Sequence, residues 1–423
     1  MGTATGSDTA LQASVSENSW IRTCRPDIPQ DSSEFKEELN EILASFMLSN
    51  FSRYSKQLEQ RLRELLNASH ALTVPNATTA LDMLLSTLPE GSDVLVPSFT
   101  FASTIHAVVR ARLRPNFVDI EPETFNICPR DAATKITQNT SAILAVNAFG
   151  NPCRIDELQA LAKKHHLKLF FDSAAAIGSR FRGRLLGVFG DAEVFSMSGT
   201  KIVTAGEGGF ITTNDDTLAE ELDYKRNYGY SKRDNDCLYV GFNGKLNELN
   251  AMFALHSLPL MDSNIAWRQK MVAIYREQLE SIPGIEFQQT VAGCQTNYCT
   301  FAVKIDSEKF GLDASSLRER LNRQNIETMR YFSPPMHKTR AYKEYNDLKL
   351  PNTETLAERV LCLPMHSHLT MEQAETVCQA LRMIHFSSIS ENSKHRISMH
   401  DGNGFDRFSS TRPELPMADA ATI

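Results

Sequence analysis

The sequence of 423 residues lacks several features that mark large classes of protein. No apolar run approaches the ~20 residues that a membrane-spanning helix needs, and the polar residues 1–18 lack the apolar core of a signal peptide. Lys and Arg are not clustered, and the formal net charge is -7, which argues against a nucleic-acid surface. We therefore expect a cytoplasmic protein that binds neither a membrane nor nucleic acid.

Metal-binding and disulfide patterns are also missing. The eight cysteines are scattered, and none of them forms a CxxC pair. This distribution favours reduced, structural thiols. Because the histidines have no clustered partners of the kind that a zinc site uses, we expect no metal.

The two ends of the chain lack the hydrophobic periodicity of packed elements. Residues 1–18 are rich in Ser, Thr and Ala, whereas residues 387–423 mix Ser, Asn, Gly, Pro and charged residues. Both segments are predicted to be disordered tails.

Between these tails, short β-like runs alternate with amphipathic helical runs, which is typical of an α/β fold with a mainly parallel sheet flanked by helices. Strands are predicted near residues 71–74, 94–96, 116–120, 142–146, 168–171, 193–196 and 209–212. The pattern then changes, with a strand at 301–305 and helices at 314–323 and 370–384. We predict a large domain at 19–270 and a smaller C-terminal α+β domain at 271–386.

Two charged residues stand out in the predicted large domain. Asp172 ends the apolar strand 168–171, at the sheet edge where α/β proteins bind ligands, and small residues follow it. Lys201 lies among Ser, Thr and Gly residues, but the GxxxxGK[ST] order of a phosphate-binding P-loop is missing. A lysine in such a turn suits a Schiff base. Taken alone, each residue is equally consistent with a helix cap or a surface turn.

Two other strand ends carry groups that suit a flat, phosphorylated ligand. Residues 74–81 pass directly from a strand into a helix, where free backbone amides and Thr hydroxyls can bind phosphate. Phe101 follows another strand, and an aromatic ring there can stack on a planar cofactor. By themselves these features also fit an ordinary Thr-capped helix and ordinary core packing.

Together, the order and spacing of these motifs resemble the fold-type I enzymes that use pyridoxal 5'-phosphate (PLP), and within them the DegT family of sugar aminotransferases. The resemblance covers roughly residues 26–384. Its most specific stretches are 171–178, 195–209, 241–251 (GFNGKLNELNA), Arg268 with Tyr275, 330–337 and 358–366.

The resemblance implies roles in the chemistry for three residues. Lys201 would form the internal aldimine with PLP and, once released, move the proton between Cα and C4′. Asp172 would pair with the pyridine nitrogen and keep it protonated, so that the ring acts as an electron sink. Phe101 would stack on that ring.

The resemblance also implies a phosphate site and an assembly. The backbone amides of Ala77 and Thr78, with the hydroxyl of Ser196, would hold the cofactor phosphate. Asn243 would reach the phosphate of a neighbouring subunit, which implies a homodimer with shared active sites.

The sequence departs from the family pattern at two positions. Ala175 stands where the family usually has His or Gln near the 3′-oxygen of the cofactor, and either Ser173 or Asn147 is a candidate to replace that contact. Ala77 stands where Gly is common, which constrains the phosphate turn only mildly. The presence of Lys201 disfavours the dehydratase branch of the family, which has His in its place.

The resemblance therefore implies a transaminase that moves an amino group, with L-glutamate as the expected donor, to a keto-sugar nucleotide. The segment Asn50-Phe51-Ser52-Arg53-Tyr54 resembles the branch that acts on dTDP-4-keto-6-deoxyhexoses. Two alternatives stay open: a cyclitol (keto-inositol) aminotransferase, and a catalytically inert PLP-binding homologue with a regulatory role, which Ala175 keeps in view.

Overall fold

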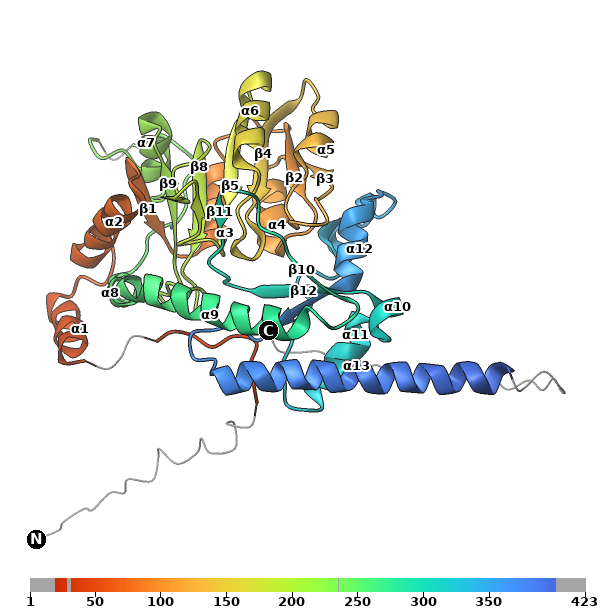
Figure 1. Cartoon of the computed structure of the whole chain (residues 1–423). Coiled ribbons are helices and arrows are strands. Elements are labelled where there is room, and N and C mark those ends of the chain that lie inside the picture. The colour runs from red at the N-terminus through yellow and green to blue at the C-terminus, as the bar shows by residue number, and fades with distance from the viewer. Residues whose placement is uncertain (1–19, 29–31, 235, 401–423) are drawn as a thin grey trace, which may run out of the picture.

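The structure is a computed structural model that describes residues 20–28, 32–234 and 236–400, with the backbone alone for residues 392–400. Its centre is a seven-stranded sheet in the order β1-β9-β8-β5-β4-β2-β3 (Figure 1). Strand β9 runs antiparallel to both of its neighbours, and the other six strands are parallel to one another. The strands are β1 His70–Val74, β2 Asp93–Pro97, β3 Arg114–Val118, β4 Thr140–Val146, β5 Lys168–Asp172, β8 Ala192–Ser196 and β9 Gly209–Thr213. This arrangement confirms the predicted mainly parallel mixed sheet.

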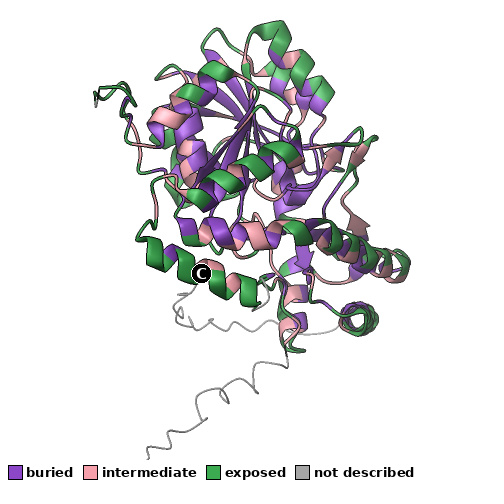
Figure 2. Cartoon of the chain, turned by 90° about the vertical axis from the view of Figure 1, so that its left-hand side faces the viewer, coloured by how far each residue is buried: buried purple, intermediate pink, exposed green. Residues whose placement is uncertain are grey.

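Helices cover both faces of this sheet. Successive side chains of a strand point to opposite faces: Leu169 and Phe171 of β5 belong to one core, and Phe170 belongs to the other. The first core is covered by α2, α5, α6 and α8, and the second by α3, α4 and α7. In Figure 2 the strands of the large sheet are mainly buried, whereas the helices around it carry both buried and exposed residues. The helices are α1 Ser33–Ser45, α2 Arg53–Leu66, α3 Ala77–Leu85, α4 Ala102–Arg110, α5 Pro129–Thr134, α6 Ile155–His165, α7 Asp216–Lys225 and α8 Glu248–Ser257.

A second, smaller antiparallel sheet, β10-β12-β13, lies below the large sheet in Figure 1. Its core is closed by α9, α10, α11 and α13. Helix α9 joins the two parts, because Met261 and Ile265 pack in the core of the large sheet whereas Met271 and Leu279 pack in the smaller one. The boundary near residue 270 stays a prediction. The elements are α9 Met261–Leu279, β10 Ile285–Phe287, β12 Phe301–Ile305, α10 Ser307–Phe310, α11 Ala314–Asn322, β13 Val360–Leu363 and α13 Met371–His400.

The segment between α11 and β13 returns to the large sheet. Met336, Tyr342 and Leu350 pack in the core that α3 and α4 cover. The segment contains the short 3-10 helices η4 Met336–Lys338 and η5 Arg340–Tyr345, and then α12 Pro351–Arg359. The remaining short elements are η2 Ala148–Gly150, η3 Leu258–Leu260 and the strands β6 Arg180–Phe181, β7 Arg184–Leu185 and β11 Cys294–Gln295.

The prediction of a structureless tail from residue 387 is wrong for residues 387–400, which continue α13. The first turn beyond that point is held by tertiary contacts: the Ser388 hydroxyl donates to the carbonyl of Phe310 (3.2 Å), and Glu391 pairs with Arg320 (2.8 Å). The polar composition of residues 387–400 led to the prediction of disorder, because it gives no sign of these contacts. The other predicted tail residues, 1–18 and 401–423, lie outside the described residues. In the described part of the chain, no helix is both long and apolar enough to cross a membrane.

Candidate active site

A cavity of about 370 Å³ opens at the carboxyl ends of the parallel strands. The residues on its sheet side end or closely follow β1, β2, β4, β5 and β8, where open α/β sheets place their ligand sites. Every predicted site residue except Asn243 lines this cavity: Ala77, Thr78, Phe101, Asp172, Ala175, Ser196 and Lys201. Ala77 and Lys201, which are 124 positions apart in the chain, thus line one cavity at the strand ends where the sequence predicted a ligand site. We call Ala77, Thr78, Asp172, Ser196 and Lys201 the strand-end wall.

Asp172 is held rigidly at the end of β5. Its side chain is almost completely buried, and it accepts a hydrogen bond from the Thr104 hydroxyl (2.8 Å) and one from the backbone N–H of Ala174 (3.1 Å). Burial raises the pKa of the Asp172 carboxyl, and the two donors and nearby Lys201 counter that rise. A carboxylate that is short of solvation in this way will bind a proton donor from a ligand strongly.

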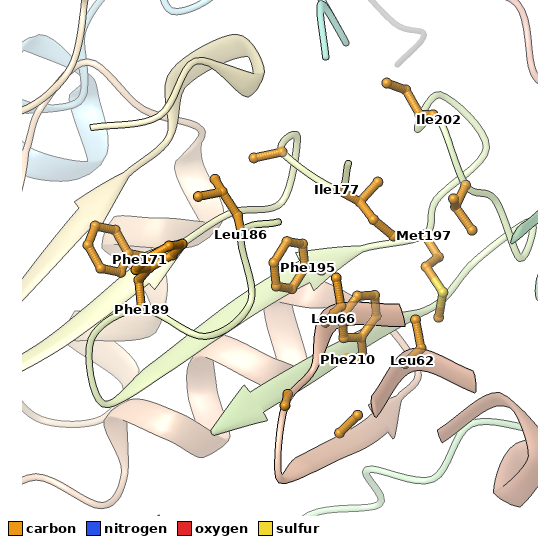
Figure 3. Packing of buried hydrophobic residues seen from close by; sticks show 14 of the residues in the cluster. Leu62, Leu66, Phe171, Ile177, Leu186, Phe189, Phe195, Met197, Ile202 and Phe210 are labelled. Atoms are coloured by element: carbon orange, nitrogen blue, oxygen red, sulfur yellow. The ribbon is translucent and has the colours of Figure 1, made fainter. Parts of the chain in front are cut away.

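Lys201 projects from a loop that is fixed on both sides. Met197, Ile202 and Val203 are fully buried in the core under α2 and α8, so the backbone around the lysine has little freedom (Figure 3). Within the loop, the backbone N–H of Lys201 donates to the carbonyl of Ser198 (3.0 Å), and that of Ala205 donates to Met197 (2.7 Å). The side chain of Lys201 is partly exposed and lines the cavity.

The packing in Figure 3 also explains why the strands before and after this loop are aligned. Phe195 of β8 and Phe210 of β9 stack with ring centroids 4.7 Å apart, and Leu62 and Leu66 of α2 lie beside them. Burial of these apolar side chains stabilises the pair of strands from which the Lys201 loop emerges.

The N-terminus of α3 offers free backbone N–H groups to the cavity. The Asn76 side chain caps only the N–H of Thr79 (2.8 Å), and the helix starts at Ala77. Strand β9 passes so close that a Cβ atom on Gly209 would lie 2.7 Å from the backbone nitrogen of Ala77. The hydroxyl of Ser196 accepts from the N–H of Ser198 (3.3 Å), which leaves its own proton for a ligand. These groups suit an anion.

Ser173 and Asn147 were the two candidates for the contact that Ala175 cannot make, and their surroundings differ. Ser173 is fully buried, does not line the cavity, and donates its hydroxyl proton to Glu193 (2.8 Å). Asn147 does line the cavity. Its side-chain nitrogen donates to Ser173 (2.8 Å), and its oxygen accepts from the N–H of Cys153 (2.8 Å), so one N–H remains for a ligand.

Behind Ser173 lies a buried carboxyl that the sequence analysis missed. Glu193 is 1% exposed, and it also accepts hydrogen bonds from the N–H groups of Gly187 (2.7 Å) and Phe189 (2.9 Å). Burial raises its pKa to about 7, and these donors counter the rise. Glu193 is the second residue of β8, so its only sequence signal was a charge inside an otherwise apolar strand. Thr104 was missed as well, although it lies one helical turn after Phe101 and therefore on the same face.

Other lining residues of the cavity come from outside the large sheet: Thr23, Cys24, Cys299, Thr300, Tyr331 and Met365, which we call the strap wall. None of these residues was predicted. Burial raises the pKa of the Tyr331 hydroxyl to about 12 and also raises the pKa of the Cys24 thiol, so both side chains are uncharged near neutral pH. The strap wall is therefore neutral, unlike the strand-end wall with Asp172 and Lys201.

Asn243 lies away from this cavity, on an exposed segment after α7. Next to it along the chain, Val240 is 92% exposed, and Lys245 reaches Asn50 (2.7 Å) in the segment before α2. The role of Asn243 toward a neighbouring subunit stays a prediction. Another residue of the same motif, Glu248, is structural: its carboxylate accepts from the backbone N–H of Tyr54 (2.6 Å) and from the Ser55 hydroxyl (2.6 Å), which holds the start of α2.

The chemistry of these groups fits PLP. An anion site at the start of α3 is matched to a phosphate, the buried carboxyl of Asp172 to a protonated ring nitrogen, and the amine of Lys201 to an aldehyde. Phe101, 61% exposed on the cavity side of α4, leaves a ring face free for stacking.

Comparison with known proteins gives a consistent result. Residues 29–382 match the DegT/DnrJ/EryC1/StrS aminotransferase family. The chain is 32% identical over 365 residues to dTDP-4-amino-4,6-dideoxy-D-glucose transaminase of Shigella dysenteriae, a match that covers 86% of this chain and 99% of the relative. It is 30% identical over 349 residues to GDP-perosamine synthase of Escherichia coli O157:H7, covering 82% and 94% respectively.

A solved structure shows the same fold. The crystal structure of DesI in the presence of its TDP-sugar product superposes with a TM-score of 0.83, at 33% identity, over 90% of this chain and 96% of that chain. This likeness confirms the predicted fold-type I architecture.

Proposed function

The chain belongs to the DegT/DnrJ/EryC1/StrS aminotransferase family and is accordingly a PLP-dependent transaminase of the sugar-nucleotide type, and we propose that it moves an amino group from L-glutamate to the keto group of a dTDP-4-keto-6-deoxyhexose. The observation that carries this proposal is that Asp172, Lys201 and the free N-terminus of α3 line one cavity. An inert homologue would have no use for an amine, a buried carboxyl and an anion site in that arrangement.

In this proposal, bound PLP supplies an electron sink that lets a proton leave the substrate carbon. Lys201 would hold the cofactor covalently in the resting enzyme. Once freed, its amine would be the group that takes a proton from the substrate carbon and returns it. The Lys201 loop is fixed by Met197 and Ile202, which would keep the amine in place for that proton transfer.

The other residues of the strand-end wall bind and orient. The Asp172 carboxylate would hold a proton on the pyridine nitrogen, and Thr104 fixes the orientation of that carboxylate (2.8 Å). The backbone N–H groups of Ala77 and Thr78 and the Ser196 hydroxyl would hold the phosphate. Asn147 would take the contact to the 3′-oxygen that Ala175 cannot make.

The acceptor is assigned from two supports. The relative from Shigella dysenteriae is named for a dTDP-4-amino-4,6-dideoxy-D-glucose, and the segment 50–54 carries the pattern that resembles the 4-keto-sugar branch. The product would then be a dTDP-4-amino-4,6-dideoxyhexose, and the donor would leave as 2-oxoglutarate.

We further propose a homodimer in which Asn243 completes the phosphate site of the partner subunit. Two exposed apolar side chains support an interface there: Phe46 is 89% exposed and Val240 is 92% exposed. Their segments are adjacent, because the N–H of Glu248 donates to the carbonyl of Leu48 (2.9 Å).

The test separates the two halves of the reaction. Holoenzyme is mixed with L-glutamate, and the loss of visible cofactor absorbance is followed together with the release of 2-oxoglutarate. A dTDP-4-keto-6-deoxyhexose is then added. We expect one equivalent of 2-oxoglutarate per site, and recovery of the visible absorbance with the sugar. Recovery with keto-inositol alone would establish the cyclitol alternative, and no response to any amino acid would establish the inert homologue.

A further inference from the structure

The strap wall contains a buried hydroxyl that the protein itself does not satisfy. Thr23 is 6% exposed and lines the cavity, and its Oγ1 atom has no hydrogen-bond partner among the described residues. Buried polar side chains in folded proteins are normally paired, so an unpaired one that faces a cavity indicates a ligand contact.

The backbone around Thr23 holds this hydroxyl in place. Its N–H donates to the carboxylate of Glu327 (2.9 Å), and its carbonyl accepts from the N–H of Met365 (3.0 Å). Two residues earlier, Ile21 pairs with the 325–327 segment through hydrogen bonds of 2.8 and 2.9 Å. These contacts fix the backbone that carries the Thr23 side chain at the cavity.

Residues 21–27, which we call the strap, are fixed at their other end too. The buried carboxylate of Asp27 accepts from the Ser367 hydroxyl (2.7 Å) and pairs with His368 (3.1 Å) and with the buried guanidinium of Arg268 (3.9 Å). The ring of Pro26 lies 3.8 Å from where a Cβ of Gly199 would be, next to the Lys201 loop. The strap thus spans from the smaller sheet to the loop that carries the lysine.

The same contacts tie the strap to the rest of its wall. Arg268 donates to the backbone carbonyls of Cys299 (3.3 Å) and Met365 (3.0 Å), both of which line the cavity. Thr23, Cys299 and Met365 are therefore held together by one set of hydrogen bonds, as a preformed subsite requires.

The charge of the strap wall defines what it can bind. Among the described residues that line the cavity, Lys201 is the one Lys or Arg, and it belongs to the other wall. A neutral wall without a cation gives no partner to a diphosphate or a carboxylate, but its Thr and Tyr hydroxyls suit the hydroxyl and carbonyl oxygens of a sugar ring.

From these observations we infer that the strap wall is the subsite for the hexose ring of the acceptor, and that Thr23 is a specificity-determining residue whose hydroxyl hydrogen-bonds an oxygen of that ring. The inference rests on the proposed function and adds to it the residues that bind the sugar ring.

The test compares the sugar with the amino acid in the same cavity. Holoenzyme is reacted in single turnovers with L-glutamate, and separately with dTDP-4-amino-4,6-dideoxy-D-glucose or GDP-perosamine, which run the sugar half-reaction in reverse. Binding of the same amino sugars to the pyridoxamine form is measured by calorimetry, which reports affinity without turnover.

Thr23→Val keeps the shape of the side chain and removes its hydroxyl. We expect the kcat/KM for the amino sugar to fall about tenfold, as loss of a hydrogen bond between uncharged groups does, mainly through a higher KM. The Kd for the amino sugar should rise by a similar factor. The kcat/KM for L-glutamate should fall at least fivefold less, and Thr23→Ser should restore the sugar reaction to within about threefold.

Thr328→Val is the matched control. Thr328 is also fully buried with an unpartnered Oγ1 atom among the described residues, but it does not line the cavity. The control should leave both half-reactions at wild-type rates.

The outcomes separate the two proposals. If the wild type reacts with an amino sugar but Thr23→Val reacts equally well, or loses sugar and glutamate reactions to the same extent, the assignment of Thr23 is wrong and the proposed function stands. If the wild type converts L-glutamate but neither amino sugar, the proposed acceptor is wrong and the sugar subsite is rejected with it.

Discussion

The strand-end wall and the strap wall face the same cavity, but the chain builds them differently. Each residue of the strand-end wall ends a strand of one sheet, lies in the loop after it or starts the next helix, so its position depends on local chain geometry. The strap wall combines residues near positions 23, 299, 331 and 365, which meet only through long-range contacts. The first wall carries the charged groups that chemistry needs, and the second is neutral and suited to recognition.

If this division is correct, changes in the strand-end wall should lower both half-reactions, and changes in the strap wall should act mainly on the sugar. The largest effect is expected at Lys201. Lys201→Ala should lower turnover with either substrate by at least about 10³-fold and abolish the visible absorbance of the bound cofactor, because the covalent link and the proton carrier are lost together.

Lys201→Arg is the matched variant, since it keeps a positive charge without a nucleophilic amine. It should be as inactive as Lys201→Ala in steady-state assays. Turnover by either variant above about one hundredth of the wild-type rate would show that Lys201 is not the proton carrier.

The next effect is expected at Asp172. Asp172→Asn keeps the side-chain shape but cannot hold a proton on the ring nitrogen, so kcat should fall about 10²-fold in both half-reactions. Thr104→Val removes only one of the two hydrogen bonds to this carboxylate and should cost severalfold. Stopped-flow measurement of each half-reaction shows whether Asp172→Asn loses more activity than Thr104→Val. Equal losses in the two variants would contradict the direct role of Asp172.

Substitution of Asp27, which anchors the strap, should disturb the strap wall. Asp27→Asn leaves the buried Arg268 without its anionic partner, and burial already lowers the pKa of that guanidinium. We expect the free energy of unfolding to fall by about 3 kcal/mol, and the sugar half-reaction to suffer more than the glutamate half-reaction.

Urea titration and the two half-reactions measure this, with Asp262→Asn as control. Asp262 is exposed on the same helix, α9, and its substitution should change stability by less than about 0.5 kcal/mol. A strap variant that loses both half-reactions equally would remove the distinction between the two walls.

The smallest effect concerns the buried carboxyl behind the strand-end wall. Burial raises the pKa of Glu193 from 4.5 to about 7. Between pH 4.5 and pH 7, Glu193 therefore keeps its proton in the folded state, whereas the unfolded state has released it. The stabilisation is fully present below about pH 4.5 and is lost as pH rises to about 7, amounting to about 2 kcal/mol between pH 5 and pH 7.

Glu193→Gln cannot titrate, so its free energy of unfolding should change less with pH than that of the wild type over this range. Urea titrations at pH 5, 6 and 7 give the difference between the two proteins, which removes the contribution of other groups such as His366, whose pKa burial lowers to about 4. Parallel pH profiles would show that Glu193 is ionised in the folded protein.

Much of the fold was predictable from hydrophobic patterning. The seven strands of the large sheet were each expected within a few residues of their observed bounds, because a buried strand bounded by turn residues leaves a clear local signal. The C-terminal helix was underestimated. Its last turns are polar, and they are helical in part because Ser388 and Glu391 contact α10 and α11, which no local pattern records.

Long-range contacts that leave no local sequence pattern also distinguish Ser173 from Asn147 as a partner for the 3′-oxygen of the cofactor. Both residues lie at strand ends beside the cavity, and both have side chains suited to a ligand oxygen. Ser173 donates its proton to Glu193 on the neighbouring strand, whereas Asn147 lines the cavity and keeps one N–H for a ligand.

The amino-acid sequence by itself determined the sheet, the helix start at Ala77, and the positions of Asp172 and Lys201, since each depends on where a strand ends and a helix or loop begins. Only the tertiary structure decided the strap wall. The Thr23 hydroxyl has a defined place because Glu327 and Met365 hold its backbone and Asp27 anchors the strap, through contacts between residues at opposite ends of the chain. Such contacts arise when separate elements pack together, and for that reason they leave no periodic signal in the sequence.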